Sequence, residues 1–139
     1  MYVQYNRDEN KRFPEAAYHF QEVFKQNKDA TLWLVGQFSP ELINYNFDFF
    51  NNENISYLGV IEDRKRLADI MRQCKYIYFP AFADASPNTL AEAMACGCKP
   101  LLLNIIGGSV EVMKNNENKP YTIQEMADEY ISIFKKLLC

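Results

Sequence analysis

Histidine and glycine are scarce in this chain, and several common nucleotide and hydrolase motifs are absent. Its 139 residues include one histidine and five glycines. No G-x-G-x-x-G or G-x-x-x-x-G-K-S/T sequence occurs, which excludes the common dinucleotide fingerprint and the P-loop. The absence of G-x-S-x-G excludes the nucleophile elbow of a hydrolase, and no acidic cluster of a receiver domain is present.

Long apolar runs and an excess of basic charge are also missing. No run approaches the length of about 18 residues that a membrane-spanning helix needs, and no signal peptide opens the chain. We therefore expect a cytoplasmic protein without a transmembrane segment. The net charge of -3 argues against a general nucleic-acid binder, because phosphate contacts require a basic face.

The residues that usually hold metals show no metal-binding spacing. His19 lies in a helical pattern without an apparent partner, which favours a structural or partly exposed histidine over a base. No D-x-D pair occurs, and the sequence predicts no metal site. The cysteines lie in or beside apolar segments without a paired C-x2-C spacing, which favours buried reduced thiols. They are Cys74, Cys96, Cys98 and Cys139.

Short apolar runs alternate with helical patterns along the chain. This alternation predicts βαβ units, and hence a parallel sheet with helices on both faces. Residues 1–139 are expected to form a single Rossmann-like, three-layer αβα domain, because a content of 48% hydrophobic residues suffices for one core. We expect strands at 1–5 (an edge or truncated strand), 31–35, 55–58, 76–79 and 100–103, and helices at 13–24, 41–50, 64–74, 87–97 and 122–138.

The stretch 79–97, FPAFADASPNTLAEAMACG, carries most of the functional signal. An apolar strand ends at Phe79, and Ser86 followed by Pro87 is a strong helix start that Gly97 ends as a left-handed cap. In a parallel α/β sheet, ligands bind outside the carboxyl ends of the strands. There, helix N-termini offer free N–H groups and a positive dipole end to anions.

Two carboxylates bracket this expected helix start. Asp84 precedes the helix, and Glu92 lies with Asn88 on the side opposite the apolar face. A nucleotide sugar needs such an arrangement: amides for the diphosphate, one carboxylate for sugar hydroxyls and another for the ribose diol. Taken alone, the D-x7-E spacing is common by chance, and a capped, solvated helix is its ordinary interpretation.

The order of motifs is more specific than this spacing. D-x7-E followed by A-M-A-C-G and then G-G-S-V-E resembles the E-x7-E region of retaining GT-B glycosyltransferases, in particular family four, which acts on polysaccharides and glycolipids. The resemblance covers nearly all of the chain but only the C-terminal, donor-binding half of the fold. It implies a fragment that lacks the N-terminal acceptor domain, binds donor nucleotide weakly and transfers nothing alone.

The resemblance also implies the reaction and the residues. A hexose would pass from a UDP-, GDP- or ADP-sugar to a glycan or lipid acceptor, with retention and without a metal or cofactor. Arg7 and Lys11 match the basic pair that holds the diphosphate, with Arg12 as an alternative to the lysine. Asp84 stands where the family usually has a glutamate that contacts the donor sugar. The implied catalytic residues are Arg7, Lys11 and Asp84, and the implied nucleotide-binding residues are Gly36, Val60, Ile61, Ser86, Asn88, Thr89, Leu90 and Glu92.

Other features leave alternatives open. The loop 107–111, GGSVE, would lie beside the donor sugar by the same resemblance, although a plain turn is the ordinary interpretation. Arg64, Lys65 and Arg66 are interpreted as a solvated helix start, although three cations near a positive dipole end are unfavourable. A non-catalytic nucleotide-sugar-binding or regulatory module is the alternative function, and peripheral membrane contact through the missing domain also stays open.

Overall fold

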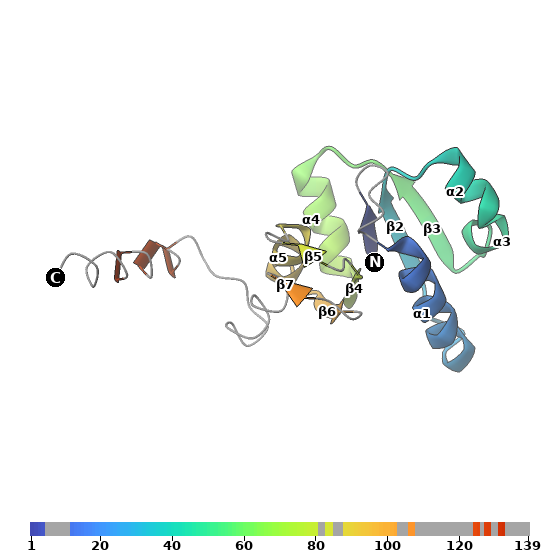
Figure 1. Cartoon of the computed structure of the whole chain (residues 1–139), viewed down its shortest axis with the longest axis horizontal. Helices are drawn as coiled ribbons and strands as arrows, with labels where there is room; N and C mark the ends of the chain where they lie inside the picture. The colour runs from blue at the N-terminus through green and yellow to red at the C-terminus, as the bar shows by residue number, and fades with distance from the viewer. Residues whose placement is uncertain are drawn as a thin grey trace.

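A computed structural model describes residues 1–4, 12–80, 83–84, 88–102 and 106–107, together with 124–125, 127–128 and 131–132. Five parallel strands form the central sheet in the order β3-β2-β1-β4-β6 (Figure 1). The fold is α/β and Rossmann-like, as the alternating pattern predicted. The strands are β1 (Tyr2–Gln4), β2 (Leu32–Gly36), β3 (Ile55–Gly59), β4 (Tyr76–Phe79) and β6 (Lys99–Leu102).

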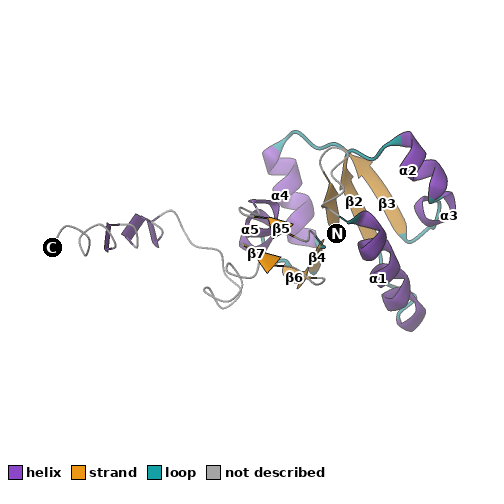
Figure 2. Ribbon diagram, viewed as in Figure 1, coloured by secondary structure: helices purple, strands orange, loops and turns teal. Residues whose placement is uncertain are grey.

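Helices cover both faces of this sheet (Figure 2). On one face, α1 (Phe13–Gln26), α2 (Pro40–Tyr45) and α3 (Phe47–Phe50) form a core with Tyr2 and Tyr78. On the other, α4 (Arg64–Gln73) and α5 (Asn88–Ala95) form a core with Val3 and Ile77. Neighbouring residues of β1 and β4 thus point to opposite faces, and both faces are apolar because parallel sheets are buried on both sides.

β1 is the central strand of the sheet, so the expectation of an edge strand was wrong. The alternative, a truncated strand, is not contradicted by its three residues. β1 pairs with β2 through Tyr2, Val3 and Gln4 and with β4 through Tyr2, whose side chain is buried. Chain order runs outward from β1 through β2 and β3 on one side and through β4 and β6 on the other. The switch point of the topology therefore lies between β1 and β4.

The helix expected at 41–50 is two helices, and this prediction was wrong. Ser39 caps α2 as the sequence suggested, because its Oγ accepts a hydrogen bond from the Leu42 amide at 3.2 Å. The break falls at Asn46, whose side-chain amide donates to the Leu42 carbonyl at 2.9 Å. Asn46 is the C-cap of α2 and leaves the helical conformation, and asparagine favours such helix ends even where the apolar pattern continues.

A second, two-stranded ladder was also missed by the sequence pattern. β5 (Ala83–Asp84) pairs in parallel with β7 (Ile106–Gly107), and Asp84 is the register partner of Gly107. We had interpreted both segments as loop, because two residues are too few to show an alternating pattern. Within the described part of the chain, no helix combines the length and apolar character that crossing a bilayer requires.

Candidate functional site

Two helix starts mark the carboxyl edge of the sheet. α4 begins after β3, where Asp63 Oδ1 accepts hydrogen bonds from the amides of Lys65 and Arg66 at 2.9 and 3.3 Å. α5 follows β4 and begins at Asn88. Both helices return toward the amino edge along the same face, so their N-terminal amides and positive dipole ends lie at the edge where parallel α/β sheets bind ligands.

The predicted base-contact and nucleotide residues differ in what they expose at this edge. Gly36 ends β2 with a φ of 112°, and its carbonyl accepts a hydrogen bond from the Tyr57 hydroxyl at 3.1 Å. Val60 is 52% exposed, whereas Ile61 is 5% exposed and belongs to the core. A nucleobase at this turn would therefore meet the side chain of Val60 and only the backbone of Ile61.

On α5, the predicted residues divide between core and surface. The side chain of Leu90 is fully buried, so its predicted contribution is limited to its backbone amide. Asn88 is exposed, and Thr89 and Glu92 are half-buried. Gly97 follows the helix with a φ of 96°, which confirms the expected left-handed end.

Glu92 has a partner that sequence reasoning missed. Its Oε1 lies 2.5 Å from Nη1 of Arg64, the first residue of α4. We had interpreted Arg64, Lys65 and Arg66 only as a solvated helix start. The available signal was weak, because the capping residue Asp63 already places a carboxylate beside these three cations at the positive end of the helix dipole.

The diphosphate-binding residues implied by the sequence fall largely outside the described residues. Arg7, Lys11 and Ser86 lie there entirely, and Asp84 is described only through its backbone pairing with Gly107. That pairing places Asp84 beside the start of the GGSVE stretch. Arg12, the alternative to Lys11, precedes α1 with a φ of 48° and forms an ion pair with Glu15 at 2.6 Å.

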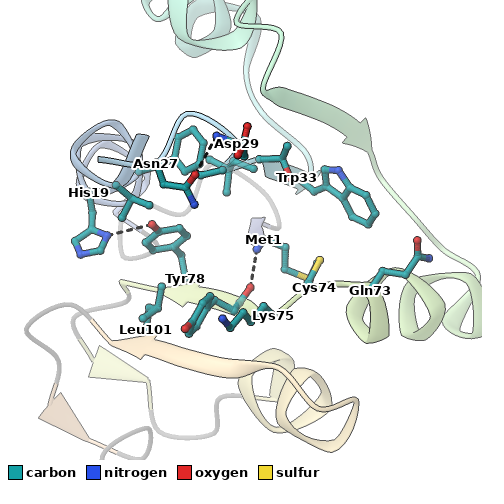
Figure 3. Close-up of a pocket in the computed structure, with 16 residues that line it drawn as sticks. Met1, His19, Asn27, Asp29, Trp33, Gln73, Cys74, Lys75, Tyr78 and Leu101 are labelled. Carbon is teal, nitrogen blue, oxygen red and sulfur yellow. Dashed lines mark hydrogen bonds between the residues drawn. The ribbon is translucent and has the colours of Figure 1, made fainter. Parts of the chain in front are cut away.

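A cavity of about 640 Å³ lies at the opposite, amino edge of the sheet (Figure 3). It is bounded by Met1, by the starts of β2 and β4 and by the side of α1. The Nδ1 atom of His19 lies 3.1 Å from the Tyr78 hydroxyl there, so this half-buried histidine has a partner that the sequence did not reveal. Among the described residues that line it, Lys75 is the one lysine or arginine, so we do not assign this cavity to a diphosphate.

Comparison with known proteins decides the family. The sequence matches the model of the family described as glycosyl transferases group 1 over residues 3–139. The chain belongs to this family. A search of curated protein sequences found no match.

Two solved structures share the fold of this glycosyl transferase domain. One is the C-terminal domain of LpcC, a glycosyl transferase group 1 family protein from Francisella tularensis. The TM-score is 0.67 at 19% identity, over 96% of this chain and 74% of that one. The other is the GtfA/B complex, with a TM-score of 0.66 at 16% identity, over 96% of this chain and 28% of that one. Likeness at these identities shows the fold alone.

No group of three histidine, cysteine, aspartate or glutamate side chains that could hold a metal ion occurs among the described residues of this glycosyl transferase domain. Cys98, one of the thiols expected to be buried, is only 4% exposed and donates to the Met71 carbonyl at 3.1 Å. Burial raises the pKa of the Cys98 thiol from 9.0 to about 11 and the pKa of Tyr78 from 10.0 to about 12. Such thiols are poor nucleophiles at neutral pH.

These raised pKa values predict a loss of stability in alkali. The folded state holds both protons more tightly than the unfolded chain, so this contribution is complete below about pH 9 and is lost as the pH rises toward 12. Cys98→Ser keeps a hydrogen-bond donor but does not titrate in this range. When the pH is raised from about 8 to about 10.5, the free energy of unfolding measured with urea should fall in both proteins. The fall should be smaller by about 1–2 kcal/mol in Cys98→Ser than in the wild type. The prediction is wrong if the free energy of unfolding depends on pH in the same way in both proteins.

Proposed function

We propose that this chain is the donor-binding half of a GT-B glycosyltransferase. It would bind a nucleoside diphosphate sugar and, joined to an N-terminal acceptor domain, transfer its hexose to a glycan or lipid acceptor with retention of configuration. The observation that carries the proposal is the half-exposed Glu92 beside Arg64 where α4 and α5 begin, in a chain of this family. A cytoplasmic location belongs to the same proposal.

Each predicted residue has a chemical task in this reaction. Arg7 would grip the diphosphate through its guanidinium fork, and Lys11 would add a point charge. Asp84 would hold hydroxyls of the donor sugar, Glu92 would accept from the ribose diol, and the amides from Asn88 to Leu90 would bind phosphate oxygens. These groups act on charge that develops in the transition state, so no metal or cofactor is required.

The transfer itself exchanges one bond for another at the anomeric carbon. Its bond to the diphosphate oxygen breaks, and the electron pair stays on that oxygen. The acceptor hydroxyl oxygen forms the new bond and gives its proton to the departing diphosphate. The chain's own residues would stabilise the leaving group, a task equivalent to that of an oxyanion hole.

A titration of the 139-residue chain with UDP, GDP and ADP tests this proposal. We expect one of the three to bind with a Kd near the millimolar range and to raise the melting temperature, because a ligand that binds only the folded state stabilises it. The matching monophosphate should bind more weakly, since part of the contact is to the second phosphate. If none of the three binds at millimolar concentration to a chain that circular dichroism shows to be folded, the assignment fails.

A second candidate is a non-catalytic nucleotide-sugar-binding or regulatory module. Asp84 favours it, because its side chain is shorter than that of the glutamate usual at this position and reaches less far toward the sugar. The two candidates separate in a protein that includes the acceptor domain. Replacing Arg7 and Lys11 together should abolish turnover in a transferase, whereas a regulatory module shows no turnover to lose.

A further inference from the structure

The first turn of α4 carries three consecutive cations, Arg64, Lys65 and Arg66, at the positive end of the helix dipole. Repulsion among them and from the dipole disfavours this cluster, and the carboxylate of the capping residue Asp63 offsets part of that cost. Lys65 and Arg66 form no ion pair with any other described residue. Arg64 instead reaches across to α5 and forms an ion pair with Glu92, 28 residues further along the chain.

This contact joins two elements whose relative placement is already fixed. α4 and α5 share one core, in which Leu67 and Met71 of α4 lie with Leu90, Ala93 and Met94 of α5. Figure 1 shows the two helices on the same face of the sheet. The helix backbones therefore do not need the ion pair to stay together.

Solvent exposure makes the pair a weak source of stability. The side chain of Arg64 is 82% exposed and that of Glu92 is 40% exposed. Pairs of this kind contribute about 0–1 kcal/mol, because water screens the charges and two long side chains lose rotamer freedom. What the contact does fix is the position of the Glu92 carboxylate, which its own flexible side chain would otherwise leave variable.

We propose that Arg64 is a positioning residue for nucleotide recognition. It holds Glu92 by Oε1, and within the described part of the chain no hydrogen bond is donated to Oε2. The carboxylate thereby stays in place to accept hydrogen bonds from the vicinal hydroxyls of a ribose. A side chain ordered before binding loses less conformational entropy when the ligand arrives. This inference rests on the proposed function, since it names how that site recognises its ribose.

The test uses two ligands and a small set of variants of the 139-residue chain. The ligands are the nucleoside diphosphate that binds best among UDP, GDP and ADP, and its 2′,3′-dideoxy counterpart. Arg64→Ala should weaken binding of the ribose form by about 2- to 5-fold, the most that a pair of up to about 1 kcal/mol can contribute by ordering one side chain. The dideoxy form should bind equally to both proteins. Arg64→Lys keeps the charge and should recover part of the loss.

Matched controls separate positioning from a general electrostatic effect. Lys65→Ala removes the same charge from the same helical turn without touching Glu92, so it should not discriminate between the two ligands. In a double-mutant cycle, Arg64→Ala should have no further effect once Glu92→Gln is present. Thermal unfolding of Arg64→Ala should differ from the wild type by only a few degrees, as a weak exposed pair requires.

Each contrary outcome is informative. If the wild type binds neither nucleotide, the proposed function fails and the inference fails with it. If the wild type binds but Arg64→Ala weakens the ribose and dideoxy forms alike, Arg64 acts on the phosphates, so the positioning role is wrong while the proposed function stands. Unchanged binding of the ribose form by Arg64→Ala overturns the inference in the same way.

Discussion

Replacing Phe13 by alanine should lower the free energy of unfolding by about 3–5 kcal/mol, the usual cost of removing a buried aromatic ring. The side chain is 3% exposed, and its ring touches four others. Their centroids lie 5.1–5.7 Å away, close enough for favourable tilted and edge contacts. The cavity would separate α1 from β1, α3 and the segment after β2. The four rings are Tyr2, Phe38, Phe49 and Phe50.

Urea unfolding followed by circular dichroism measures this loss. Tyr18→Ala is the matched control, because Tyr18 is also an aromatic residue of α1 but is 66% exposed, and a surface change should stay within about 0.5 kcal/mol. A loss of this size is a large part of the stability of a small domain, so Phe13→Leu provides a milder variant with a smaller loss. If Phe13→Ala costs no more than Tyr18→Ala, the aromatic cluster is not the core that we describe.

The sequence predicted the strands well, and the reason is physical. β4 is a short run of aromatic and branched residues, and three of its four residues are buried, as a parallel strand covered on both faces requires. The order of the strands in the sheet could not be predicted in this way. The central place of β1 follows from pairing with β2 and β4, which lie roughly 30 and 75 residues further along the chain, and no local pattern encodes such pairing.

The helix break at Asn46 shows a second limit. The apolar residues of 41–50 continue through the break, so periodicity predicts one helix. At the break, the Leu42 carbonyl accepts from both the backbone and the side-chain amide of Asn46, and an asparagine is compatible with a continuing or an ending helix. Sequence patterns predict where helices are favoured better than where they stop.

The candidate site was predictable in part. Motif order pointed to Glu92 and to the helix that carries it, because cap residues and spacing are local. The Arg64 contact was not predictable, since it depends on how α4 and α5 pack across 28 residues of sequence. Arg7, Lys11 and Ser86 lie outside the described residues, so their assignment stays a prediction.

The largest functional effect is expected from replacing Arg7 and Lys11 together by alanine. If both side chains hold the diphosphate, the double variant loses two charge-assisted hydrogen bonds, each contributing about 1.5–3 kcal/mol. Binding of the preferred nucleoside diphosphate should then weaken by about 10²-fold or more, beyond detection for a ligand that binds near the millimolar range. Calorimetry on the wild type and the double variant measures this difference.

Single variants decide which basic residue accompanies Arg7. Arg12 already forms an ion pair with Glu15, so Arg12→Ala should have little effect on nucleotide binding, whereas Lys11→Ala should weaken it strongly. Lys25→Ala, which removes an exposed lysine near the far end of α1, is the control for lost charge alone. If the double variant binds like the wild type, the basic pair lies elsewhere. If Arg12→Ala weakens binding more than Lys11→Ala does, Arg12 has taken the lysine's role.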